Sequence, residues 1–333
     1  MTAVELRDIY RARVGMAGIA RRTPLVHSAG LSAHTGAEVY LKLENQQETG
    51  SFKVRGAANF LVSMEPAARA RGVVTVSTGN HGRAVAYVAR RLGMRAVVCV
   101  PRLVLPHKVE AIRRLGAEVR VRGADQDEAE AYARQIADQD GLALVSPFDD
   151  PKVIAGQGVI GVELLEELPD VDTVIVPLSG GGLIGGIGVA LKAASPQIRL
   201  VGVSMARGPV MVRSLEAGRP VQLPEEETLA DSLMGGIGLE NRYTFDLVRR
   251  VVDETALLSE EEIAAAMVYA LRQERQIVEG GGAVALGALL HDKIDVAGQR
   301  VAVVVSGGNV DLERLARLLN ESWAAAPAVR NSD

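Results

Sequence analysis

The hydrophobic residues of this chain fall into short apolar runs that alternate with segments of mixed polarity. Between residues 72 and 149 the apolar runs are too short for helices, and the segments between them place apolar residues three or four positions apart. This pattern predicts parallel strands joined by crossover helices. The predicted strands are Val73–Val76, Ala96–Val100, Ala117–Val121 and Leu142–Val145, and the predicted helices are Arg83–Leu92, Lys108–Leu115 and Glu128–Asp138.

The alternation continues on both sides of this region. Helices are expected within residues 1–22, over Phe52–Met64, from Pro151 to Leu168 and over Ser259–Glu274, and a further helix is expected to end at Ala194. Strands are expected at Val39–Glu44, Thr173–Val176, Leu200–Val203 and Val301–Val305. Such apolar strands belong to sheets covered on both faces. We predict an α/β protein with two open, mostly parallel twisted sheets and helices on both faces. Residues 1–71 and 150–330 form a large domain, 72–149 a small inserted domain, and 324–333 a flexible tail.

The composition restricts the partners of the chain. Its 333 residues are 48% hydrophobic and carry a net charge of -4 with both signs interspersed, so neither a nucleic acid nor a membrane surface is expected, and a small-molecule ligand fits better. The uncharged stretch Thr173–Leu191 is long enough to span a bilayer, but Pro177 and several glycines divide it. One cysteine, Cys99, lies in a predicted strand, and the N-terminus lacks a signal-peptide core, which indicates a cytoplasmic location.

Residues 48–56 place Lys53 at the start of a predicted helix. Gly50 permits a tight turn, Ser51 can cap the first helical amides, and Phe52 supplies an apolar wall beside the ammonium. A helix N-terminus and partial desolvation both disfavour the charged form, so Lys53 is a candidate for an amine that forms a Schiff base. The alternative is a lysine on a solvated helix face.

A glycine-rich loop connects a predicted strand to the next helix. It contains Ser179, Gly180, Gly181, Gly182 and Leu183. Successive glycines at a helix start can direct backbone N–H groups at a phosphate. The loop also satisfies the dinucleotide pattern G-x-G-x-x-G, but the next strand ends in serine where that fingerprint needs an acidic residue. A monophosphate is favoured, with a turn needed only for packing as the alternative.

Two further strand-to-helix loops carry small polar side chains, and the ends of parallel strands bring such loops together. The first contains Ser77, Thr78, Gly79, Asn80 and His81, and the second begins at Ser306. The first suits a carboxylate and an aromatic hydroxyl. Taken alone, each loop is equally typical of a helix N-cap. Taken alone, His81 is equally typical of a buried structural histidine. Together, the lysine, the phosphate loop and the carboxylate loop describe a pyridoxal-phosphate enzyme acting on an amino acid.

The chain resembles the fold-type II pyridoxal-phosphate family of threonine and serine dehydratases and serine racemases over essentially its whole length. The matching motifs are Ser51-Phe52-Lys53, Ser77-Thr78-Gly79-Asn80-His81, Ser179–Leu183 and Ser306-Gly307-Gly308-Asn309. A narrower resemblance, to the dehydratases of hydroxyectoine utilisation, rests on Ser77–Arg83, Val203-Ser204-Met205, Ala230-Asp231-Ser232-Leu233 and Gly235–Asn241.

The family resemblance implies that pyridoxal 5'-phosphate lies between the domains, joined to Lys53. The residues implied to hold it are Phe52 and Asn80 at the ring, Ser179, Gly180, Gly181, Gly182 and Leu183 at the phosphate, and Ser306 at the pyridine nitrogen. A neutral serine leaves that nitrogen largely unprotonated, which favours prompt loss of a β-substituent. The resemblance places Lys53 and Thr78 in catalysis, and Ser77, Thr78, Gly79, Asn80 and His81 around the substrate.

The implied reaction removes a β-hydroxyl and an amino group from a hydroxy amino acid to give a 2-oxo acid and ammonia. A hydroxy-diaminobutyrate derived from hydroxyectoine is the expected substrate. An L-threonine or L-serine dehydratase, a serine racemase, a non-catalytic ligand sensor and, more distantly, an NAD-linked dehydrogenase stay open. A homodimer is expected because the family usually dimerises.

Three departures from the family pattern limit what is carried over. Racemases have a serine where this chain has Thr78, whose methyl group adds bulk and disfavours racemisation. Relatives with a divalent metal have carboxylates where this chain has Ser204 and Val210, so no metal is expected. Arg83 replaces a common glutamine and Ser232 a common glycine. Either could tune the side-chain pocket, or Arg83 could be a solvated helix residue.

Overall fold

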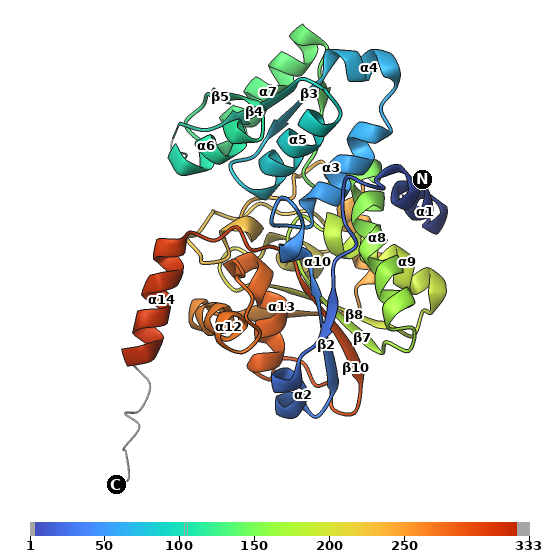
Figure 1. Ribbon diagram of the computed structural model, residues 1–333, viewed down its shortest axis with the longest axis vertical. Coiled ribbons are helices and arrows are strands. Elements are labelled where there is room, and N and C mark those ends of the chain that lie inside the picture. The colour runs from blue at the N-terminus through green and yellow to red at the C-terminus, as the bar shows by residue number, and fades with distance from the viewer. Residues whose placement is uncertain (1–3, 103, 105, 325–333) are drawn as a thin grey trace.

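The structure is a computed structural model that describes residues 4–102, 104 and 106–324 (Figure 1). Residues 325–333 of the predicted tail lie outside this part. The strands are β1 Leu25–His27, β2 Glu38–Leu43, β3 Val73–Val76, β4 Ala96–Val100, β5 Glu118–Val121, β6 Ala143–Leu144, β7 Thr173–Pro177, β8 Arg199–Met205, β9 Glu254–Leu258 and β10 Arg300–Val305. The α-helices are α1 Leu6–Gly15, α2 Ala29–Thr35, α3 Lys53–Val62, α4 Pro66–Arg71, α5 Asn80–Arg91, α6 Pro106–Arg114, α7 Gln126–Asp140, α8 Pro151–Glu167, α9 Gly182–Ala194, α10 Val210–Ala217, α11 Thr244–Val251, α12 Glu260–Arg272, α13 Gly280–Leu290 and α14 Leu312–Ala324. Two short 3-10 helices are η1 Glu44–Gln46 and η2 Asp231–Leu233.

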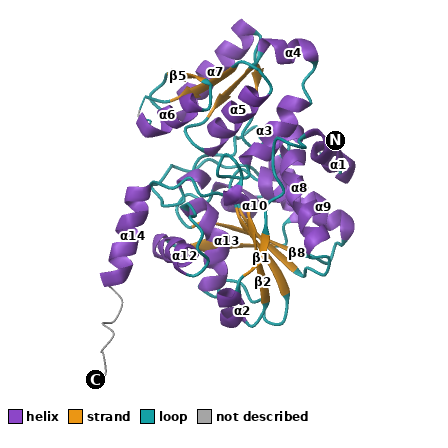
Figure 2. Ribbon diagram, in the orientation of Figure 1, coloured by secondary structure: helices purple, strands orange, loops and turns teal. Residues whose placement is uncertain are grey.

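The larger sheet has six strands in the order β1-β2-β10-β7-β8-β9. β1 is antiparallel to β2, and the other neighbours are parallel. Residues of β10 alternate between two cores: Val301 and Val303 pack with α12 and α13, whereas Ala302 and Val304 pack with α8 and α9. The sheet is therefore covered on both faces, as the apolar pattern predicts (Figure 2).

The smaller sheet has four parallel strands in the order β5-β4-β3-β6. One of its faces packs on α7 through a core that includes Val74 and Cys99, so the predicted buried strand position of the cysteine is confirmed. Helix α3 lies between the two sheets and contacts both α5 and α8 (Figure 1). Two mostly parallel sheets with helices on both faces confirm the predicted fold class. The predicted domain limits at residues 72 and 149 stay a prediction.

Several elements begin or end at other residues than predicted. The first helix covers only Leu6–Gly15, because the chain turns after it and Gly18 adopts φ +76. The helix expected from Arg83 begins at Asn80. Helix α13 was not predicted, because its opening glycines are typical of a loop; a Cβ on Gly282 would lie 2.3 Å from the Gly307 carbonyl oxygen, so glycine is needed for this close approach.

Other predictions are confirmed. The helix from Ser259 is opened by a capping box, in which the Ser259 N–H donates to Glu262 and the Glu262 N–H donates to Ser259. The uncharged stretch Thr173–Leu191 forms β7, a loop and part of α9. Within the described ranges, no helix has both the length and the apolar character needed to cross a bilayer.

Candidate active site

Lys53 is the first residue of α3 and follows a tight turn. Gly50 in this turn has φ +75, a backbone conformation that favours glycine. The Lys53 Nζ donates a hydrogen bond of 2.8 Å to the Pro147 carbonyl oxygen and lies 5.1 Å from the centroid of the Phe52 ring. The amine is therefore directed at the segment between β6 and α8.

The glycine-rich loop packs on the same segment. A Cβ added to Gly180 would lie 2.4 Å from the Phe148 ring, and one added to Gly182 would lie 2.9 Å from the Phe148 carbonyl oxygen. Gly181 has φ +84 at the start of α9, and the Ser179 hydroxyl donates to the carbonyl oxygen of Leu233 at 2.8 Å. Since the first amides of a helix lack intrahelical partners, this loop is a suitable anion cradle.

The loop that follows β10 pairs with the lysine turn. Ser51 and Gly307 form an antiparallel bridge, and the Phe52 N–H donates to the Ser306 carbonyl oxygen at 3.1 Å. Ser51 does not cap α3, which corrects the prediction: Phe52 has helical backbone angles and occupies the cap position. In the described part of the chain, the buried Ser51 hydroxyl has no hydrogen-bond partner.

The side chain of Asn309 joins the lysine turn to the loop after β3. Its Nδ2 donates to the Thr49 carbonyl oxygen at 2.8 Å and to Asn80 Oδ1 at 2.7 Å, and its Oδ1 accepts from Arg83 Nη1 at 2.7 Å. Asn80 in turn donates to Glu279 Oε1 at 2.6 Å. Arg83 is therefore part of a polar chain that ends on a buried carboxyl group, and it is not a solvated helix residue.

Two ionisable groups in this cluster have pKa values close to neutral pH. Burial lowers the pKa of Lys53 to about 8, although the Glu279 carboxylate opposes this. Burial raises the pKa of Glu279 to about 7, and Asp231 adds to this, whereas hydrogen bonds from Asn80 and Ser232 oppose it. An amine that loses its proton near neutral pH suits both Schiff-base formation and general-base chemistry.

The imidazole of His81 supports the loop from inside the protein. It is 3% exposed, and its Nε2 lies 3.2 Å from the Val145 carbonyl oxygen. Burial, followed by the positive charge of Lys53, lowers the pKa of His81 to about 3. The ring is therefore neutral, and a direct contact of His81 with substrate stays a prediction.

The other small polar residues line the ends of their strands. Ser77 and Thr78 are half-buried, and the Gly79 N–H donates to the Ser77 hydroxyl at 3.2 Å, which closes a local turn. Ser306 is 4% exposed, and its hydroxyl lies 3.5 Å from the Gly281 carbonyl oxygen. The structure thus brings together the three loops and the lysine named from the sequence.

Sequence reasoning missed Glu279, Pro147 and Phe148 and gave Asn309 no role. Glu279 directly precedes three glycines, so an acidic residue at an apolar, glycine-rich helix start was the signal available. Pro147 and Phe148 lie near the predicted domain limit at residue 149, and no role was predicted for them. No local pattern marks a backbone carbonyl as the partner of a lysine.

Comparison with known proteins identifies the class. The model of the pyridoxal-phosphate dependent enzyme family matches residues 17–307, so the chain belongs to this family. It is 48% identical to a putative threonine dehydratase of Sinorhizobium fredii, with 94% of each chain covered. It is 43% identical to an L-threonine ammonia-lyase of Thermotoga maritima, over 96% of this chain and 79% of that one.

Solved structures place the chain more narrowly. Maize serine racemase superposes with a TM-score of 0.90 at 33% identity, covering 97% of this chain and 99% of the racemase. A serine racemase of Dictyostelium discoideum gives a TM-score of 0.86 at 34% identity, covering 93% and 99%. The chain is a fold-type II member of the threonine and serine dehydratase and serine racemase group. It is a pyridoxal-phosphate-dependent lyase, as the sequence predicts.

The residues present fit pyridoxal phosphate. The glycine cradle has no room for a Cβ, the buried Ser51 hydroxyl lacks a partner among the described residues, and Lys53 is a desolvated amine.

Ser204 stands where the family resemblance places a metal ligand. It is 3% exposed, and its hydroxyl contacts the Met205 sulfur. Within the described ranges, no group of three His, Cys, Asp or Glu side chains is arranged to hold a metal ion.

Proposed function

We propose that this lyase removes water and ammonia from a β-hydroxy amino acid, with Lys53 as the amine that holds the cofactor and moves the Cα proton. The observation that carries the proposal is the position of Lys53: its amine has a pKa of about 8 and is directed at the segment that backs the glycine loop. The names of relatives that release ammonia from L-threonine support the reaction class.

Each loop has a separate task in this mechanism. The glycine loop, Ser179–Leu183, would hold the phosphate of the cofactor, and Asn80 and Ser306 would orient its ring. Bound pyridoxal phosphate withdraws electrons from the substrate amine and so makes the Cα proton acidic. With the cofactor bound, the Lys53 amine would be the general base that takes this proton. The amides and hydroxyls of the loop that begins at Ser77 hold the substrate carboxylate.

The departure of the β-hydroxyl completes the reaction. Its oxygen takes up one proton, which balances the proton that Lys53 removes from Cα, and leaves as water. The unsaturated amine that remains then reacts with water to give a 2-oxo acid and ammonia. A neutral Ser306 hydroxyl would leave the pyridine nitrogen of the cofactor largely unprotonated, which would favour this elimination over transamination. Thr78 is a proton donor of limited mobility, so racemisation is slower than elimination.

The finer substrate proposal is a hydroxy-diaminobutyrate that derives from hydroxyectoine. Its support is the match at Ser77–Arg83, Ser204 and Ser232, together with the position of Arg83 in the polar chain to Glu279. L-threonine or L-serine dehydration is the second candidate, favoured by the names of the relatives. An NAD-linked dehydrogenase is disfavoured by Ser204, because no acidic group stands there for a ribose.

A panel of threonine, serine, hydroxyaspartate and hydroxylated diaminobutyrates, assayed for ammonia and 2-oxo acid, tests the proposal. We expect the highest kcat/KM with a hydroxylated diaminobutyrate. Turnover of threonine alone contradicts the finer proposal but keeps the dehydratase. Absence of 2-oxo acid from every substrate contradicts the proposed reaction.

We also propose a cytoplasmic homodimer. The free, buried Cys99 suits a reducing compartment, and the homodimer rests on the family resemblance. Sedimentation of the holoenzyme measures the oligomeric state, and a monomer at micromolar concentration contradicts the homodimer. Fractionation of the cells that express the enzyme tests its location, and recovery outside the cytoplasm contradicts it.

A further inference from the structure

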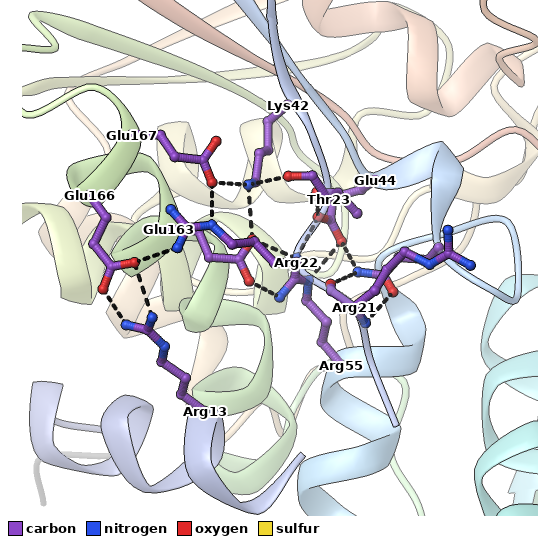
Figure 3. A network of polar contacts seen from close by, with 11 residues as sticks. Arg13, Arg21, Arg22, Thr23, Lys42, Glu44, Arg55, Glu163, Glu166 and Glu167 are labelled. Atoms are coloured by element: carbon purple, nitrogen blue, oxygen red, sulfur yellow. Dashed lines mark hydrogen bonds and ion pairs between the residues drawn. The ribbon is translucent and has the colours of Figure 1, made fainter. Parts of the chain in front are cut away.

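A cluster of charged side chains lies in the interior beside the helix that carries Lys53 (Figure 3). Its centre is Arg55 of α3, which is 1% exposed. Around it lie Glu44 of η1 at 0% exposure, Glu163 of α8 at 4% and Lys42 of β2 at 0%. The two positive and two negative charges balance, and none of the four has a part in the proposed chemistry.

Arg55 uses its whole guanidinium to bind two carboxylates. Its Nε and Nη2 each donate to Glu44 at 2.8 Å, and its Nη1 and Nη2 donate to Glu163 at 2.7 and 2.8 Å. Lys42 Nζ lies 2.9 Å from the Glu163 carboxylate and donates to the Thr23 carbonyl oxygen at 2.8 Å. Two bidentate pairs on one planar group fix its position and its orientation together.

The two helices that Arg55 connects also approach closely. A Cβ added to Gly156 of α8 would lie 2.6 Å from the Arg55 carbonyl oxygen, and one added to Gly56 would lie 2.8 Å from Val153. The glycines allow α3 to lie directly on α8. The Arg55 guanidinium, which is bound to Glu163 of α8, fixes the position of α3 along the α8 axis. A displaced helix would leave donors and acceptors unpaired in the interior.

Electrostatics show that the pairs are made between charged groups. Burial alone would raise the pKa of Glu44, but Arg55, together with Thr23 and Lys42, more than compensates and holds that pKa below its ordinary value. Buried pairs of this kind add little stability relative to apolar side chains of the same volume. What such a cluster does supply is a single permitted arrangement of its elements, because a planar fork fits its carboxylates in one orientation.

We propose that Arg55 is a positioning residue that holds the start of α3 so that the Lys53 amine meets the cofactor and the substrate. The inference rests on the proposed role of Lys53, which stands two residues before Arg55. In the proposed role the Lys53 side chain would have to move in order to carry a proton, so its backbone at the start of α3 must keep it in place. A displacement of about 1 Å in such an arrangement can lower a rate about 100-fold.

Two variants test the inference in the holoenzyme. Arg55→Lys keeps the positive charge beside the two carboxylates but cannot make both bidentate pairs. Arg55→Met combined with Glu44→Gln removes one charge of each sign and leaves Lys42 paired with Glu163. The matched control is Arg13→Met, which removes the Arg13–Glu166 ion pair at the exposed edge of the same network (Figure 3).

The measurements separate position from folding. Thermal unfolding and phosphate content show whether each variant is folded and retains cofactor. Borohydride reduction followed by peptide mass spectrometry gives the fraction of Lys53 that carries a pyridoxyl group. We expect both Arg55 variants to keep the cofactor, to lower this fraction, and to lower kcat at least about 10-fold with KM unchanged. The control keeps the wild-type values.

Wild-type labelling and kcat in either folded Arg55 variant overturn the inference, as does an equal loss in the Arg13→Met control. Loss of cofactor in proportion to activity also overturns it, because Arg55 would then support the fold generally. The proposed role of Lys53 fails by a different result: the wild-type enzyme itself would carry no pyridoxyl group on Lys53.

Discussion

Replacement of Glu279 by glutamine is expected to change how the stability of the protein depends on pH. Glu279 is 5% exposed and accepts a hydrogen bond from Asn80 at 2.6 Å. Glutamine has the same shape, and its carbonyl oxygen can accept the same bond. The substitution therefore removes the titration of this side chain without opening a cavity.

The magnitude follows from the pKa of Glu279. In the folded protein this pKa is about 7, against an ordinary value of 4.5. A gap of about 2.5, at about 1.4 kcal/mol for each pKa unit, corresponds to about 3 kcal/mol. Because the folded state holds the proton more tightly than the unfolded state, this group lowers stability as the pH rises from 4.5 through 7. The full cost is present above pH 7, and none is present well below pH 4.5.

Urea unfolding between pH 4 and pH 8 measures this cost. We expect the free energy of unfolding of Glu279→Gln, relative to wild type, to rise by about 3 kcal/mol across that range. Glu226→Gln, at an exposed carboxylate, is the control and should leave the pH dependence of wild type unchanged. Parallel pH curves for Glu279→Gln and wild type would refute the raised pKa of the buried Glu279 carboxyl group.

Four further predictions concern the site. Lys53→Ala abolishes turnover and the visible absorbance of the bound cofactor; an active, yellow variant would end the proposal. In the cofactor-free protein, labelling of Lys53 by an amine reagent rises through pH 8 rather than above pH 10, because burial lowers its pKa from 10.5 to about 8, and peptide mapping across pH checks this. Gly180→Ala forces a Cβ against Phe148 and weakens cofactor binding at least about 10-fold, as fluorescence titration would show; unchanged affinity would contradict the cradle. Thr78→Ser increases racemisation relative to elimination, because it removes a methyl group, and chiral chromatography of the products measures this; an unchanged ratio would contradict the steric argument.

The sequence predicts much of the fold and the main loops of the site, because both depend on local patterns. Short apolar runs mark the strands, and glycines beside small polar residues mark the loops that follow them. The roles of Glu279 and Asn309 were not predicted, because they depend on contacts between segments that are far apart in the chain. The Ser51 cap was wrong because that backbone pairs with Gly307, a partner that no local pattern shows.

The position of β10 in its sheet has a consequence for biosynthesis. It is the last strand along the described chain, yet it pairs with β2 on one side and β7 on the other. A nascent polypeptide that has not yet released Arg300–Val305 from the ribosome leaves both neighbours with open hydrogen-bonding edges, which are prone to aggregation. The sheet is therefore completed only after that segment has emerged, and chaperone demand should be greatest just before it does.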